Sequence, residues 1–113
     1  MGAVGPAQFI VFVNGRIRSF NKTTGIADGV LNIDPDVFFS LVTTPPGAGE
    51  VTFTSDPNVR YDRLTGRWFL SIIDVTQNTT TGSLRANRNL FAWSDGPIIS
   101  GSTVWNFTYY QNA

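Results

Sequence analysis

Apolar and polar side chains alternate along the end of the chain in the way expected of a β-strand. Trp105, Phe107 and Tyr109 fall on one face of an extended segment, whereas Asn106 and Thr108 fall on the other. The patterns in this half of the chain predict four strands, at residues 58–62, 67–75, 89–94 and 104–111. Joined in sequence order as a meander, they form one antiparallel sheet, which is the unit that a β-propeller repeats around its axis.

The second of these strands is apolar on both faces. Trp68, Leu70 and Ile72 alternate with Phe69, Ser71 and Ile73. A strand of this kind suits a sheet that is covered on both sides, as a propeller blade is by its neighbours. The residues that we expect in the core are Trp68, Ile72, Phe91 and Phe107.

A hairpin is predicted near the N-terminus, over residues 9–20. The dipeptide Asn14-Gly15 separates two strand-like runs, 9–13 and 16–20. This pattern favours a type I′ turn, in which both central residues have positive φ. The preceding residues, 1–8, are expected to be a loose lead-in, with Gly5-Pro6 as a chain breaker.

Between the hairpin and the meander the patterns are weaker. Residues 26–33 fit no single element. Asp34 is a potential N-cap followed by Pro35, which predicts one short helix over residues 35–41. Residues 43–49 and 76–88 are expected to be loops, and 50–54 an extended segment that leads into the sheet. The overall prediction is an all-β fold within 1–113, either one small domain or a propeller segment made of the 9–20 hairpin and a 56–111 blade.

Composition excludes several kinds of chemistry. The 113 residues include no Cys and no His, so thiolate metal sites, His-based zinc sites and a Ser-His-Asp triad are excluded within this chain. The net charge is zero, which argues against a protein built to bind nucleic acid and leaves little charge repulsion to oppose self-association. There is no apolar run of membrane-spanning length. No metal or cofactor is predicted.

The N-terminus, MGAVGPAQF, lacks the basic and apolar regions of a signal peptide. The chain is therefore expected either to be cytoplasmic or to begin after a signal that has been removed. Thr, Asn and Ser provide most of its polarity, a composition that is common in extracellular β-proteins.

Several short motifs together resemble a family of secreted or cell-surface bacterial β-propellers with a sialidase-like fold. The matching residues are Val4-Gly5-Pro6, Val13-Asn14-Gly15, Phe20, Lys22, Thr24-Gly25, Asp56-Pro57, Val59, Tyr61-Asp62, Arg67-Trp68 and Ala92 to Ser94. The resemblance implies an extracellular location, a propeller fold and, for most members, no assigned activity. Family members are several times longer, so this chain corresponds to about one blade and a hairpin. The Asp-box spacing of sialidases is not matched, which weakens the implied glycosidase activity.

Five residues are candidates for ligand binding. Asp62 and Arg67 flank the turn at 63–66, where they are expected to form an ion pair across the hairpin, or alternatively to leave Arg67 for substrate recognition. Asp56 and Arg60 would lie at one mouth of a propeller channel, although Asp-Pro also starts turns without any ligand. Trp93 is a candidate for stacking on a sugar ring, as are the other two tryptophans, although large aromatics more often pack between blades.

These observations leave two functions in competition. The favoured hypothesis is a non-catalytic extracellular structural or binding β-module that associates with itself or with the rest of a longer propeller, with carbohydrate as a candidate ligand. The alternative is a segment of a sialidase-like glycoside hydrolase, which would need two carboxylates at one site.

Overall fold

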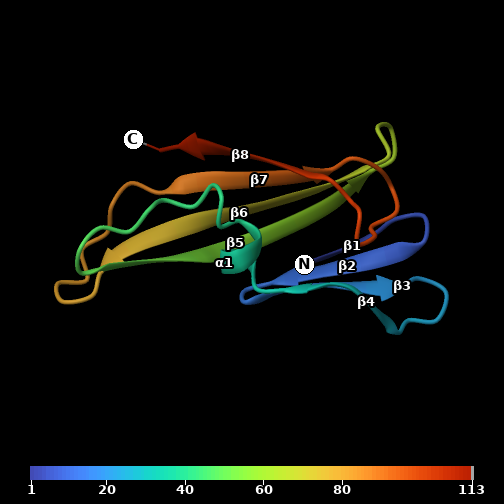
Figure 1. The fold of residues 1–113 in the computed structure, drawn as a ribbon, viewed down its shortest axis with the longest axis horizontal. Coiled ribbons are helices and arrows are strands. Elements are labelled where there is room, and N and C mark those ends of the chain that lie inside the picture. The colour runs from blue at the N-terminus through green and yellow to red at the C-terminus, as the bar shows by residue number, and fades with distance from the viewer. Residues whose placement is uncertain (113) are drawn as a thin grey trace.

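The chain forms two four-stranded antiparallel sheets, each with its strands in sequence order (Figure 1). The structure is a computed structural model and describes residues 1–112. Sheet A contains β1 (Gly2–Val4), β2 (Gln8–Val13), β3 (Arg16–Asn21) and β4 (Ala27–Ile33). Sheet B contains β5 (Glu50–Asp62), β6 (Arg67–Asn78), β7 (Arg88–Ser94) and β8 (Trp105–Gln111), and the short helix α1 (Pro35–Phe38) lies between the two sheets in the sequence. The predicted all-β class and the predicted C-terminal meander are confirmed.

Sheet A is larger than the predicted hairpin. The expectation of a loose lead-in at residues 1–8 is wrong, because β1 pairs with β2 from Gly2↔Val11 to Val4↔Phe9. Residues 26–33, which fitted no single element, contribute β4. The pairing of β4 with β3 is interrupted by a bulge between Arg18 and Phe20, and Gly29 within β4 has φ 74°. These irregularities break the two-residue period and explain why the sequence pattern is weak there.

The turn of the β2–β3 hairpin is not of type I′. Gly15 has φ 87°, but Asn14 is not among the residues with positive φ, and a type I′ turn requires positive φ at both. Instead, the Oδ1 atom of Asn14 accepts a hydrogen bond of 3.2 Å from the backbone N–H of Asp56 in β5. A contact with the second sheet therefore holds the tip of this hairpin.

One hydrophobic core joins the two sheets. Its members include Ile10, Phe12 and Ile17 from sheet A and Trp68, Leu70, Ile72 and Leu90 from sheet B, all between 0 and 2 % exposed. The sheets lie closest along β1, β2 and β5. Farther from this line the space between them is filled by Phe39, whose ring lies 6.3 Å from Phe12 in sheet A and 5.8 Å from Phe107 in β8.

Helix α1 begins as predicted and ends early. The Asp34 side chain accepts a hydrogen bond of 2.8 Å from the N–H of Asp36, and Pro35 occupies the first turn. The helix stops at Phe38 rather than Leu41 because Phe39 leaves the helical conformation and enters the core. In the part of the chain that the structure describes, no helix has the length and apolar character needed to cross a membrane.

A buried glutamine ties sheet A to the connection between β7 and β8. Gln8 is 6 % exposed; its Oε1 accepts from the N–H of Ile99 at 2.8 Å, and its Nε2 donates to the Ile99 carbonyl at 3.0 Å. The same Nε2 donates to the Asp28 carboxylate at 2.7 Å, and that carboxylate also accepts a hydrogen bond of 2.6 Å from the Ser19 hydroxyl. Asp28 therefore orders the segment around the bulge in β4.

We expect this network to weaken in acid. Burial acts to raise the pKa of Asp28, but the hydrogen bonds from Ser19, Gln8 and the Val30 N–H outweigh it, so the pKa lies below its ordinary value of 3.8. A lowered folded-state pKa adds stability above the unfolded-state value, and this stability is lost as the pH falls through the folded-state value. Asp28→Asn should thus melt below wild type near neutral pH, and the difference should shrink below pH 3.8. Thermal melts across the acid range test this; a constant difference would contradict it.

Candidate functional site

The strongest candidate site is the face of sheet B that points away from sheet A, which we call the outer face. Residues directly opposite one another in an antiparallel ladder lie on the same face of the sheet, so the strand register shows which residues belong to the outer face. Across the strands its rows are Arg60, Phe69, Trp93 and Asn106; Asn58, Ser71, Phe91 and Thr108; Ser55, Ile73, Asn89 and Tyr110; then Phe53 with Val75, and Val51 with Gln77.

Large apolar side chains on the outer face remain open to solvent. Phe53, Phe69 and Phe91 are 39 %, 40 % and 41 % exposed, and Tyr110 is 66 % exposed. On the opposite face of the same strands, Trp68 and Leu90 are completely buried. Apolar residues gathered on one uncovered sheet face are typical of an interaction surface, whereas single exposed apolar residues need no explanation.

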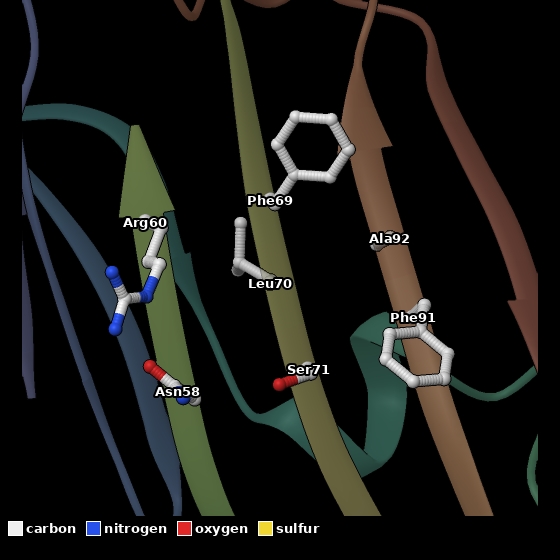
Figure 2. A pocket seen from close by; sticks show the side chains of 7 residues that line it. All are labelled: Asn58, Arg60, Phe69, Leu70, Ser71, Phe91 and Ala92. Carbon is white, nitrogen blue, oxygen red and sulfur yellow. The ribbon is translucent and has the colours of Figure 1, made fainter. Parts of the chain in front are cut away.

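A shallow depression of about 250 Å³ lies on this face. Figure 2 shows the rings of Phe69 and Phe91 on β6 and β7, with Arg60 and Asn58 on the neighbouring β5. Ser71 lies on β6 directly opposite Phe91, and the strands carrying Leu70 and Ala92 complete the lining. Oδ1 of Asn58 is buried and has no hydrogen-bond partner among the described residues. The depression thus combines two aromatic walls with a guanidinium group, an amide and a hydroxyl.

A second hollow, of about 320 Å³, adjoins the first, because Asn58, Ser71 and Phe91 line both. Asp56 lies at its edge, in a bulge of β5 where the register shifts between Ser55 and Asn58. Asp56 has φ 64°, the one non-glycine residue of the described chain with positive φ. The Asp56-Pro57 dipeptide therefore marks a bulge within a long strand, not a turn before a short one.

The expected ion pair between Asp62 and Arg67 is not formed. The two residues are directly opposite in the ladder, as the sequence predicted. However, the Asp62 carboxylate accepts hydrogen bonds from the Thr65 hydroxyl at 2.6 Å and the Leu64 N–H at 3.1 Å, which lower its pKa. Within residues 1–112, the ion pair closer than 4.0 Å is Glu50 with Arg85, at 3.0 Å. The Asp62 carboxylate accepts hydrogen bonds from the turn and not from Arg67, because the turn's N–H and hydroxyl donors are only two and three residues away in the sequence.

The outer face brings the predicted candidates together. Arg60 lines the first depression and Asp56 the second, and Trp93 lies half-buried beside Phe69. Asp62 and Arg67 lie at the turn end of the same sheet. Carboxylates are absent from the lining of the first depression, and no group of three metal-ligating side chains is found in the described part of the chain.

Sequence reasoning missed four lining residues: Asn58, Phe69, Ser71 and Phe91. The prediction that Phe91 is a core residue is wrong, whereas Trp68 and Ile72 are buried as predicted and Phe107 packs against the core. Phe91 alternates with the buried Leu90 and Ala92, and this two-residue period is the signal that could have placed it on the opposite face.

In comparisons with known proteins, no protein-family model matches this chain, and neither a curated protein nor a solved structure matches it. Function is therefore inferred from the geometry of the two sheets.

Proposed function

We propose that this chain is a non-catalytic structural and binding β-module, secreted or displayed at a cell surface. In this proposal it supplies two consecutive blade-like sheets to a larger assembly of the β-propeller type, and the outer face of sheet B receives a further sheet. That sheet comes from another copy of the chain or from the rest of a longer polypeptide.

The observation that carries this proposal is the uncovered apolar outer face of sheet B. Sheet A already covers the inner face of sheet B. We expect a further sheet to cover the outer face by the same kind of packing. The two meanders lie closest along β1, β2 and β5, and farther out the ring of Phe39 lies between Phe12 of β2 and Phe107 of β8. Sheets that are close at one edge and splayed at the other are what a radial array of blades requires.

Replacing the two exposed phenylalanines should weaken this association. Phe69→Thr and Phe91→Thr each remove an aromatic ring from the outer face and keep a residue that favours strands. Burial of such a ring contributes about 1.5–3 kcal/mol, so each change should raise the dissociation constant by about tenfold or more. Light scattering and sedimentation over a concentration series measure this effect.

Leu64→Thr is the matched control, because Leu64 is 96 % exposed in the β5–β6 turn, beyond the face. It should associate as wild type does. If the Phe69 and Phe91 variants have unchanged masses while wild type is associated, the outer face is not the contact, and the proposal fails.

A carbohydrate is a second candidate occupant of the depression between Phe69 and Phe91. Aromatic walls beside the Arg60 guanidinium and the Ser71 hydroxyl provide both stacking and hydrogen-bonding groups. Titration with simple sugars, followed by the fluorescence of nearby Trp93, tests this reading, with Phe69→Thr as the variant expected to lose the signal. Turnover of fluorogenic glycosides would instead favour the hydrolase alternative.

A further inference from the structure

The edges of the two sheets differ in how well they are protected against pairing with another strand. An unprotected edge presents free N–H and C=O groups, and proteins usually block it with short strands, bulges, proline or charge. Sheets A and B have four edge strands, β1, β4, β5 and β8.

Three of these edges carry such protection. β1 has only three residues. β4 is bulged, with Gly29 at φ 74° and the carboxylate of Asp28 within the strand. β5 is interrupted by the bulge at Asp56-Pro57, and the N–H of Thr54 is bonded at 2.8 Å by the Asp36 carboxylate.

The fourth edge, β8, has none of these features. Its sequence, WNFTYYQ, contains no charge, no proline and no glycine, and its pairing with β7 runs from Trp105 to Gln111 without a register shift. Among residues 1–112, β7 is its only ladder partner. Figure 1 shows β8 at the side of the molecule away from sheet A.

We infer that β8 pairs antiparallel with β8 of a second copy, about a two-fold axis at Thr108, to make one continuous eight-stranded sheet. This inference rests on the self-association in the proposed function but uses a different surface, the backbone edge of β8. Sheet B is antiparallel throughout, so this orientation continues its pattern. A two-fold contact uses the same edge of both copies, so it is complete in a dimer.

The register centred on Thr108 makes the strand complementary to itself. It places Thr108 opposite Thr108 of the partner subunit and Asn106 opposite Tyr110 on the outer face, and Phe107 opposite Tyr109 on the inner face. Thr–Thr and aromatic pairs are among the favourable cross-strand combinations, and no like charges face each other because β8 has none. Tyr109 and Tyr110, 47 % and 66 % exposed in the single chain, gain partners in this arrangement.

Single cysteines test the register directly, because the chain has no Cys of its own. Thr108→Cys places two sulfur-bearing residues directly opposite, with Cα atoms about 4.5–5.5 Å apart, which suits a disulfide. Asn106→Cys lies on the same strand and face, but its two copies are offset by about four residues along the paired strands. Their Cα atoms are then about 13 Å apart, which is too far for a disulfide. Under mild oxidation Thr108→Cys should form a covalent dimer at least about tenfold faster than Asn106→Cys or the loop variant Thr80→Cys.

A charge at the same position provides a second measurement. Thr108→Lys sets two like charges opposite each other and should raise the dimer dissociation constant by about tenfold or more, whereas Thr80→Lys should not. Light scattering on Phe69→Thr, in which the outer-face contact is weakened, should give about twice the 12.4 kDa chain mass at high concentration, and wild type should give at least that mass. Equal crosslinking of the Thr108→Cys and Asn106→Cys variants, or a wild type that stays monomeric, would overturn the inference. If Phe69→Thr loses only the assemblies larger than a dimer and keeps the unequal crosslinking, the outer-face contact and the β8 contact are separate, and the failure of one does not imply the failure of the other.

Discussion

Replacing Trp68 with alanine is expected to unfold the chain or bring it close to unfolding. The Trp68 ring is completely buried and packs edge-on against Tyr61, with centroids 5.0 Å apart. Its Nε1 donates to the Pro97 carbonyl at 3.0 Å, so the ring also fixes the connection between β7 and β8. Truncation of such a side chain costs about 3–5 kcal/mol, which is a large part of the stability of a small domain. Urea denaturation and thermal melts measure the loss.

Trp93→Ala is the control for this change. Trp93 lies half-buried on the outer face of sheet B, so its loss in the single chain should cost no more than about 1 kcal/mol. Equal melting temperatures for the two variants would show that burial of the Trp68 ring does not stabilise the core as expected.

Sheet B was predictable because its signals are local. The alternation along β6, and the shared face of Trp105, Phe107 and Tyr109 in β8, follow from the two-residue period of a strand and are confirmed by the register. The N-cap at Asp34 was likewise visible, because its hydrogen bond to Asp36 spans two residues. In such cases the backbone geometry of a few neighbours decides the structure.

Sheet A and the turn at Asn14 were harder to predict because distant contacts decide them. Gly5 has the pattern of a chain breaker, but a Cβ atom there would lie 2.4 Å from the Trp68 ring, so the glycine permits close packing between the N-terminal segment and β6. The side chain of Asn14 is bonded by Asp56, forty-two residues away. Patterns within a short window contain no information about these contacts.

The candidate site was anticipated in part. Arg60, Asp56 and Trp93 were singled out for chemistry or stacking, and all three lie on or beside the outer face. Its aromatic walls, Phe69 and Phe91, were assigned to blade packing or to the core, because an apolar residue in a strand predicts burial without saying which partner covers it. Only the arrangement of the two sheets shows which of the faces sheet A leaves uncovered.

Replacing Asp74 with alanine is expected to be the second most damaging change. Asp74 is completely buried on the inner face of β6, and its two carboxylate oxygens accept hydrogen bonds of 2.7 Å from the N–H groups of Thr44 and Arg88. These bonds hold the connection from α1 to β5 and the start of β7 against the sheet. Loss of the acceptor leaves two amides without partners, each costing about 1–3 kcal/mol, so the total should be about 2–5 kcal/mol. Urea denaturation measures this loss, and amide hydrogen exchange at Thr44 and Arg88 should accelerate.

Two further variants separate this explanation from a general effect of losing a carboxylate. Asp74→Asn keeps one acceptor oxygen and should recover part of the stability, whereas Asp95→Ala removes an exposed carboxylate and should change it by less than about 0.5 kcal/mol. If Asp74→Ala were as stable as Asp95→Ala, the two backbone amides would have found other partners. The connection from α1 to β5 would then be held by the guanidinium of Arg88, which donates to the carbonyls of Val42 and Thr43 at 3.0 and 3.1 Å.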